Sequence, residues 1–254
     1  MPHFYINPQN IKNNTFTVQG EQFHYLINVR RFHEGDEINI FDGLGNCYKA
    51  RIDCVDKKSI KGTVLSSKTF VLPEISVCLY TAIAKGERFD WLIEKASEIG
   101  IAKIVPVIYL RSSVTDFSSN KLERYKKISV SASSQSWRGD IMSIDMPVKF
   151  FDAVEKLSNK KDTLNIVPWE SEQNNDIIKL LKESKKLKNV NIFIGPEGGF
   201  DNKEIDFALK NNFKTVTLGK NILRVETAAI VSASIVTAVE RLKSSRDVFV
   251  SKSK

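Results

Sequence analysis

The sequence has only three cysteines and no cluster of potential metal ligands. Cys47, Cys54 and Cys78 form no CxxC pair, and no histidine lies at ligand spacing from them. An odd number of unpaired thiols argues against a disulfide framework, and the missing ligand spacing argues against a zinc site. We therefore expect reduced thiols, a cytoplasmic location and no bound metal.

The chain also lacks the features of an exported or membrane-spanning protein. Its first ten residues do not show the charged and then apolar layout of a secretion signal. The longest mostly apolar stretch, 228–239, contains Ser232, Ser234 and Thr237 and closes at Glu240. This stretch is too short to cross a bilayer core of roughly 30 Å. We expect neither export nor membrane insertion.

Negative charge is in the minority. The chain has 38 Lys and Arg against 30 Asp and Glu, which gives a formal net charge of +8. Such an excess raises the local concentration of polyanions, and nucleic acid is the natural candidate. A solvated lysine-rich surface without a partner would give the same count. The charge alone does not decide between the two.

Apolar spacing divides the chain into two domains and a tail. Three short runs with partly alternating apolar residues predict strands, at 37–41, 47–52 and 59–64. They indicate a small β-barrel or sheet over 1–70, in which Gly43 and Gly45 suit a hairpin loop that needs positive φ. Residues 21–29 predict a short helix. Residues 244–254 predict a flexible tail.

From 73 to 243 the pattern changes to apolar strands that alternate with helices. The predicted strands are 75–82, 101–108, 164–167, 190–194 and 215–218. Between the first two, apolar residues from Phe89 to Ile99 recur at the spacing of a buried helix face, and Gly100 is placed to end that helix. This alternation predicts an α/β domain with a mainly parallel sheet covered by helices.

A glycine-rich turn follows the predicted strand 190–194. It reads Ile194-Gly-Pro-Glu-Gly-Gly-Phe200, and Asp201 and Glu204 then stand at the spacing of a capping box. Open α/β sheets bind ligands at such strand ends, where glycines permit close approach and Glu197 offers a hydrogen-bond acceptor. A tight strand-to-helix turn without a ligand would look the same.

A second loop of this kind follows the strand 215–218. It reads Leu218-Gly-Lys-Asn-Ile-Leu-Arg-Val-Glu-Thr-Ala228. Arg224 and Glu226 lie between apolar residues, where charged side chains are costly unless they pair or contact a ligand. They either form a salt bridge that fixes the loop or serve a ligand. The helix predicted at 225–242 is apolar around its circumference, which fits a core helix or a subunit interface.

These two loops resemble the paired signatures of the RsmE family within the SPOUT methyltransferases. That family methylates N3 of a uridine in 16S ribosomal RNA with S-adenosylmethionine. The likeness extends through 85–100, through Ser134-Gln-Ser-Trp-Arg138 and into the amino-terminal elements 23–30 and 35–43, so it covers nearly the whole chain. Asn221 stands where the family usually has a second arginine.

The resemblance implies a PUA-like β-barrel followed by an α/β domain with a carboxyl-terminal trefoil knot. It also implies a homodimer whose interface includes the knot region. The two loops are expected to bind S-adenosylmethionine through Ile194, Gly195, Pro196, Glu197, Gly198, Gly199, Leu218, Gly219, Ile222, Leu223, Arg224 and Thr227.

The chemistry implied by the resemblance is an in-line displacement that needs no metal. We expect Arg224 to stabilise the negative charge that develops on the uracil carbonyl, with Glu226 and Glu197 as further candidates for proton acceptor or orienting group. The expected RNA contacts are His24, Arg30, Arg31, Lys85, Gln135 and Arg138. Trp137 either stacks on a splayed base or belongs to a core.

Three alternatives stay open at this point. A non-catalytic ribosomal RNA-binding protein would keep the fold without using a cofactor, although both glycine-bearing loops and Arg224 are present. A methyltransferase that acts on another RNA would share the same loops. A nucleotide-dependent oxidoreductase should carry GxGxxG after an early strand, and this sequence does not.

Overall fold

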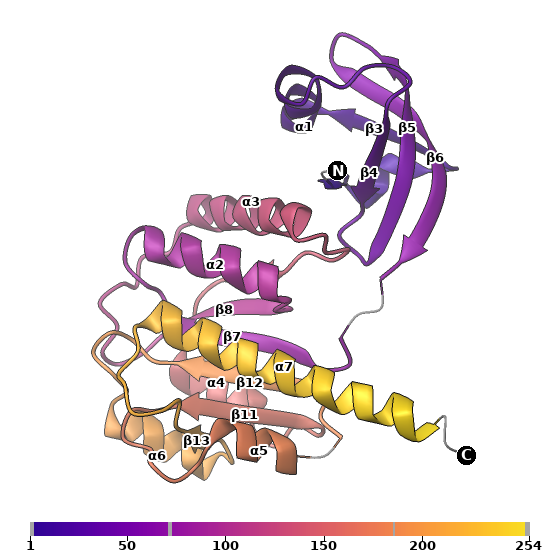
Figure 1. The fold of residues 1–254 in the computed structure, drawn as a ribbon. Coiled ribbons are helices and arrows are strands. Elements are labelled where there is room, and N and C mark those ends of the chain that lie inside the picture. Colours follow the sequence, from indigo (N-terminus) through magenta and orange to yellow (C-terminus); the bar gives the residue numbers. More distant parts are fainter. Residues whose placement is uncertain (1–2, 71–72, 185, 252–254) are drawn as a thin grey trace. The chain divides into compact units, whose positions relative to one another are not determined.

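The computed structural model describes residues 3–70, 73–184 and 186–251, and the chain groups into two compact units (Figure 1). The first unit comprises Met1–Leu72 and Val130–Ile141, and the second comprises Pro73–Ser129 and Met142–Lys254. The main division lies where the sequence pattern changes. The assignment of 130–141 to the first unit differs from the predicted contiguous domains, because it depends on contacts distant in sequence.

The first unit is built on a curled six-stranded sheet. Its order is β1-β4-β5-β6-β3-β2, with β1 parallel to β4 and the other neighbours antiparallel. The strands are β1 His3–Tyr5, β2 Ile11–Lys12, β3 Thr15–Gln19, β4 Glu37–Phe41, β5 Asn46–Val55 and β6 Ser59–Thr69. The three predicted strands are confirmed, and β5 and β6 are longer than the apolar alternation indicated.

Helical turns and tight loops complete this unit. A 3₁₀ turn spans Pro8–Asn10, and α1 (Gly20–His24) continues into a π-helical turn, Tyr25–Val29, which confirms the helix predicted there. Gly43 and Gly45 have φ of 74° and 103°, as the predicted hairpin loop requires. The unit has its own core, which includes Phe16, Leu26, Ile38, Ile40, Ile52 and Ile60.

The second unit contains a seven-stranded sheet in which every neighbouring pair is parallel. The order is β10-β8-β7-β12-β11-β13, and β9 pairs with β8. The strands are β7 Ser76–Ala82, β8 Lys103–Ile108, β9 Ser143–Ile144, β10 Val148–Lys149, β11 Thr163–Pro168, β12 Asn189–Ile194 and β13 Lys214–Val216. All five predicted strands are confirmed, within a few residues at their ends.

Helices cover this sheet. They are α2 Glu87–Ile99, α3 Ser119–Gln135, α4 Phe150–Leu157, α5 Ile177–Glu183, α6 Asn202–Lys210 and α7 Val225–Ser251. α2 and α7 pack against each other, and α7 lies along β7 and β12 (Figure 1). α2 ends at Gly100, whose φ is 95°, as predicted. The predicted α/β architecture is therefore confirmed.

The carboxyl-terminal helix is longer than expected. α7 continues to Ser251, beyond the helix predicted at 225–242 and into the segment from 244 for which we predict a flexible tail; residues 252–254 lie outside the described part. The segment 243–251 contains neither glycine nor proline, so no residue that commonly ends a helix interrupts the backbone hydrogen bonding.

No helix among the described residues is long and apolar enough to span a bilayer. Their His, Cys, Asp and Glu side chains do not gather in any group of three that could hold a metal ion.

Candidate active site

Three loops of the second unit begin at one edge of its sheet. β12, β11 and β13 are parallel neighbours in that order, so the loops that follow them start at the same carboxyl edge. These loops line a cavity of about 510 Å³. Small-molecule sites typically measure roughly 300–1,000 Å³. The ligand-binding edge predicted from the strand-to-loop pattern therefore coincides with a cavity of suitable size.

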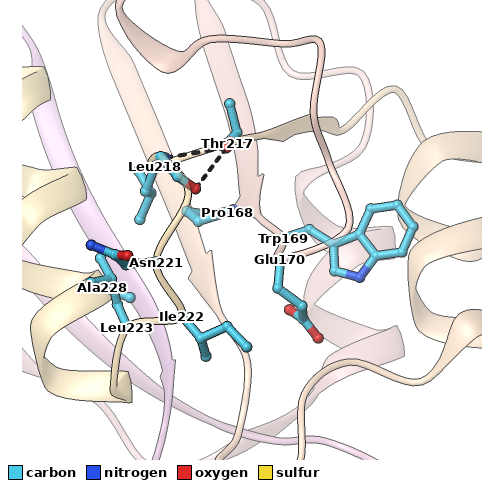
Figure 2. A pocket seen from close by; sticks show the side chains of 10 residues that line it. Pro168, Trp169, Glu170, Thr217, Leu218, Asn221, Ile222, Leu223 and Ala228 are labelled. Atoms are coloured by element: carbon cyan, nitrogen blue, oxygen red, sulfur yellow. Dashed lines mark hydrogen bonds between the residues drawn. The ribbon is translucent and has the colours of Figure 1, made fainter.

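Most of the predicted cofactor residues meet there. The cavity of about 510 Å³ is lined by Ile194, Gly195, Pro196, Glu197, Gly198, Gly199, Ile222, Leu223 and Arg224. Leu218 and Gly219 line a smaller cavity of about 90 Å³ beside the end of β11 (Figure 2). Thr227 lines a third cavity, at the start of α2.

The first loop, 195–201, is held tightly. A Cβ added to Gly195 would lie 2.8 Å from the ring of Phe200, so only glycine permits this packing. The N–H of Gly199 donates to the carbonyl of Pro196 at 2.9 Å, and Gly199 has a φ of 71°. The loop is therefore a rigid wall whose shape depends on its glycines.

A buried carboxylate fixes the end of this loop. The predicted capping box is confirmed: Glu204 accepts the N–H of Asp201 at 2.9 Å, and Asp201 accepts the N–H of Lys203 at 3.0 Å. Glu204 also accepts the N–H of Leu110 at 2.8 Å, which ties the loop after β8 to α6. Burial, with the nearby Glu204 charge, raises the pKa of Tyr109 well above its usual value.

Arginines contact the carboxylates of the same loop. Arg111 donates to the Asp201 carboxylate at 3.1 Å, and Arg88, in the first turn of α2, donates to Glu197 at 3.0 Å. Both arginines are about half exposed, and exposed ion pairs of this kind contribute roughly 0–1 kcal/mol. They orient Glu197 and Asp201 rather than hold the fold together.

The second loop, 217–224, is more loosely held. The N–H of Thr217 donates to the carbonyl of Asn175 at 2.9 Å, and the N–H of Gly219 donates to the Thr217 hydroxyl at 3.2 Å. Figure 2 shows this turn facing the end of β11. Beyond it, the side chain of Ile222 is 88% exposed. A loop this exposed can change shape when a ligand binds.

Arg224 and Glu226 do not form the salt bridge that the sequence left open. Within the described ranges, neither side chain has an ion pair or a hydrogen bond. Arg224 lines both the main cavity and the third cavity, of about 880 Å³, which also involves Trp91 of α2. An unpaired guanidinium shared by two cavities is available to a ligand in either one.

Glu172 stabilises the start of the second loop through hydrogen bonds, a role that the sequence did not predict. Its carboxylate accepts the Thr215 hydroxyl at 2.6 Å and the N–H groups of Asn174 and Asn175 at 2.9 and 3.2 Å. These hydrogen bonds, the Thr215 hydroxyl first, lower the pKa of Glu172. Because Asn175 in turn accepts from Thr217, Glu172 positions the start of the loop.

Glu170 is a second residue that the sequence did not reveal. It follows β11 and lines both the main and the small cavity, and a Cβ added to Gly199 would lie 2.7 Å from its Oε1. Within the described residues its carboxylate has no partner. The only available signal is its place three residues after the predicted strand 164–167, at the same edge.

The predicted RNA contacts lie in both units. Five of them are exposed. The first unit carries His24, Arg30, Arg31 and Gln135, and the second unit carries Lys85. Arg138 differs, because only 10% of its side chain is exposed and its Nε lies 3.0 Å from Oδ1 of Asp140. This pairing indicates that Arg138 holds its own loop in place.

The chain is similar to known proteins over nearly its full length. The family model for the RNA methyltransferase domain matches residues 72–237, and the model for the RNA methyltransferase PUA domain matches 18–65. A relative from Synechocystis, named ribosomal RNA small subunit methyltransferase E, is 30% identical over 92% of this chain and 76% of its own length.

Solved structures agree with these matches. A ribosomal RNA small subunit methyltransferase E from Neisseria gonorrhoeae, bound to S-adenosyl methionine, is 27% identical with a TM-score of 0.83, over 94% of this chain and 98% of that one. A methyltransferase from Legionella pneumophila, in complex with the same cofactor, is 26% identical with a TM-score of 0.82, over 93% and 96%.

Proposed function

The chain belongs to the RNA methyltransferase family, and we infer from this premise that it methylates N3 of a uridine in 16S ribosomal RNA with S-adenosylmethionine. The family models and the solved relatives confirm the fold class, a PUA-like β-domain followed by an α/β methyltransferase domain. The observation that carries the reaction is the cavity between the two glycine-bearing loops, with the unpaired Arg224 in its lining.

The residues of this cavity fit the cofactor. S-Adenosylmethionine presents hydroxyl and ammonium donors and a flat, largely apolar base. The unpaired Glu170 supplies an acceptor for donors, and Ile194, Ile222 and Leu223 supply apolar walls. Gly195, Gly198 and Gly199 also line the cavity, and their lack of a side chain lets Phe200, Arg111 and Glu170 pack closely against this loop. When bound, the cofactor supplies an electrophilic methyl group on a cationic sulfur.

The chain's own residues position the base and accept the proton that it loses. Uridine N3 must lose a proton as it becomes nucleophilic, and negative charge then develops on the adjacent carbonyl oxygens. Arg224, which lines both the cofactor cavity and the cavity beside α2, stabilises that charge. Glu226, half-buried two residues later, is the leading candidate to accept the proton, and Glu197 is the weaker one because Arg88 engages it.

RNA binding involves both units. His24, Arg30, Arg31 and Gln135 on the first unit and Lys85 on the second contact the RNA. The cationic members neutralise phosphates, so affinity should fall steeply with salt. Arg138 contributes by fixing the shape of the segment 137–141 through its ion pair with Asp140.

A homodimer and a knotted chain path complete the proposal. Ile222 is 88% exposed and Trp91 is 44% exposed at the cavities around Arg224, which is unfavourable unless a second subunit or a ligand covers them. We place the dimer interface there, beside α7. The trefoil knot rests on the family resemblance. A ribosomal substrate would place the protein in the cytoplasm.

The test uses small-subunit RNA from a strain that lacks this gene. The RNA is incubated with purified protein and S-adenosylmethionine, and its nucleosides are identified by mass spectrometry. The account predicts 3-methyluridine. A different methylated nucleoside would contradict the target atom. Binding of cofactor without methylation would point to another RNA, and absence of both would favour a non-catalytic RNA-binding protein.

A further inference from the structure

An exposed tryptophan ends a column of aromatic rings in the first unit. The ring of Trp137 lies 5.2 Å from that of His3, with 15° between their planes, and His3 lies 4.5 Å from Phe41. Phe41 and His3 are buried, whereas Trp137 is 46% exposed. The column therefore runs from the core to the surface, and only its outermost ring is open to a ligand.

The backbone holds this ring in an unfavourable conformation. Trp137 has a φ of 59°, in the left-handed region that bulky side chains rarely adopt. The strain is not offset by deep burial of the indole, because nearly half of it stays exposed. Strained residues that persist in this way are commonly found at binding sites.

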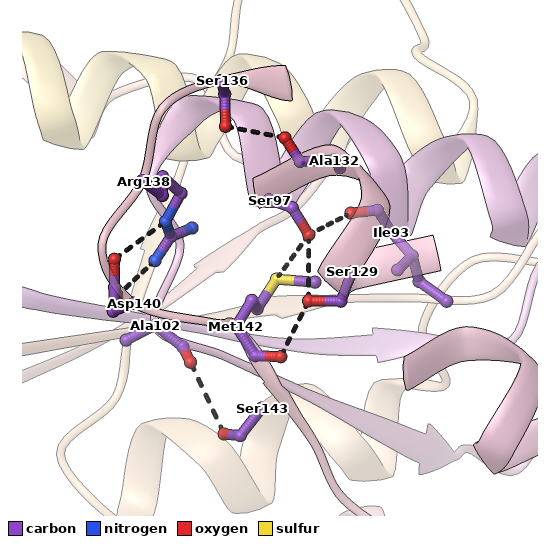
Figure 3. A network of polar contacts seen from close by, with 10 residues as sticks. All are labelled: Ile93, Ser97, Ala102, Ser129, Ala132, Ser136, Arg138, Asp140, Met142 and Ser143. Carbon is purple, nitrogen blue, oxygen red and sulfur yellow. Dashed lines mark hydrogen bonds and ion pairs between the residues drawn. The ribbon is translucent and has the colours of Figure 1, made fainter. Parts of the chain in front are cut away.

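The segment that carries Trp137 is rigid. Arg138 binds Asp140 with two hydrogen bonds, Nε to Oδ1 at 3.0 Å and Nη2 to Oδ2 at 2.5 Å (Figure 3). The carbonyl of Gly139 accepts the N–H of Gly45 at 2.9 Å, and a Cβ added to Gly139 would lie 2.9 Å from the ring of Phe70. Trp137 is therefore fixed before any ligand arrives, which reduces the entropy lost on binding.

The surroundings favour a nucleobase as the ligand. Phe70, 37% exposed, packs against Gly139. Lys68, two residues earlier, is exposed and lies in the same cross-strand row as Phe41, with Cys47 between them. A flat ring with one covered face matches the stacking sites of single-stranded nucleic acid, which combine such rings with cationic side chains.

We propose that the free face of Trp137 stacks on one unpaired base of the RNA substrate and so extends the His3–Trp137 column by one ring. This proposal rests on the proposed function, since it supplies a contact for the RNA that the second unit methylates. Stacking uses the π-face that every base possesses, so the contact adds affinity without selecting a sequence. It lies outside the cofactor loops and leaves cofactor binding unchanged.

Three variants separate stacking from folding and from general apolar contact. Trp137→Gly removes the ring and also relieves the positive φ, which offsets part of the packing lost against His3, so the protein should remain fully folded at the assay temperature. Trp137→Phe keeps an aromatic face. Trp137→Leu keeps apolar surface without a π-face. Affinity for fluorescein-labelled oligouridine is measured by anisotropy, and KM for small-subunit RNA is measured in methyl transfer.

We expect Trp137→Gly and Trp137→Leu to weaken oligouridine binding about tenfold, within the range of base–aromatic stacking, and Trp137→Phe about twofold. The slope of affinity against salt should stay the same, because no phosphate contact is removed. KM for RNA should rise in parallel, with cofactor affinity unchanged.

Wild-type oligouridine affinity in Trp137→Gly, or in Trp137→Leu, would overturn the stacking proposal. So would unchanged oligouridine affinity combined with impaired methylation of whole subunits, a result that would assign the ring to a ribosomal protein. Failure of the wild-type protein itself to methylate small-subunit RNA would instead contradict the proposed function. The two failures are therefore distinguishable.

Discussion

The two loops that bound the main cavity differ in how firmly the protein holds them. Loop 195–201 has an internal turn from Gly199 to Pro196, a Phe200 ring packed on Gly195 and a capping box at its end. Loop 217–224 has the Thr217 and Gly219 hydrogen bonds at its start. Among the described residues, no side chain from 220 to 224 has a hydrogen bond or ion pair.

This difference suggests a division of labour. The first loop is a preformed wall, so it can position a cofactor without reorganising. The second loop carries Arg224 and the exposed Ile222, and we expect it to gain order when a ligand or a second subunit covers it. Binding energy is then used to place Arg224, which links cofactor and base binding to the chemical step.

We expect the largest effect from a substitution of Arg224, in the loosely held loop 217–224. Arg224→Ala should lower kcat about 100- to 1,000-fold, as loss of one stabilising donor commonly does. Its melting temperature should match the wild type, because the side chain has no partner in the described structure. Single-turnover methyl transfer at saturating cofactor, with Arg224→Lys as control, measures this. Wild-type turnover in Arg224→Ala would remove the residue from the mechanism.

In the tightly held loop 195–201, Gly195→Ala should lower both the stability of the fold and the affinity of the site for the cofactor. Its new Cβ would lie 2.8 Å from the buried Phe200 ring, and overpacking of this kind costs about 1–3 kcal/mol. We expect a lower free energy of unfolding and loss of cofactor affinity together. Urea denaturation and calorimetric titration measure the two. Unchanged stability would mean that this wall is not rigid.

Gly219→Ala is the matched change in the loose loop. No atom lies within 4 Å of the added Cβ, but Gly219 has a φ of 116°, so the cost is backbone strain of about 1–2 kcal/mol. Because the loop can relax, we expect most of this cost in cofactor affinity and little in unfolding. A loss of stability equal to that of Gly195→Ala would erase the contrast between the loops.

The smallest expected effect is at Glu172, which couples the loose loop to the sheet. Glu172→Gln should cost about 1 kcal/mol at neutral pH, because the charged acceptor of the Thr215 hydroxyl is lost. The folded pKa lies below the ordinary value of 4.5, so this stabilisation is complete above that pH and disappears as pH falls through the folded pKa. Urea melts from pH 7 to pH 3 should show the two proteins converging. A constant difference would exclude the ionised carboxylate as its source.

Sequence patterns predicted the strands, the capping box and the two ligand loops because each depends on local spacing. The roles of Glu170 and Glu172 were not predicted. They depend on β11 lying between β12 and β13, an order that is set by long-range strand pairing. The pairing of Arg138 with Asp140 could not be predicted either, because it depends on the shape of the loop; its RNA contact stays a prediction. The sequence does not decide between a stacking and a core role for Trp137, because the exposure of a ring does not follow from its sequence neighbours.

Hydrogen–deuterium exchange with and without S-adenosylmethionine tests the central claim most directly. The account predicts that cofactor slows exchange most strongly across 217–224, changes 195–201 little because that loop is already ordered, and leaves the first unit unaffected. Equal protection of both loops would contradict the contrast between them. Absence of protection at both loops would contradict the cofactor site itself.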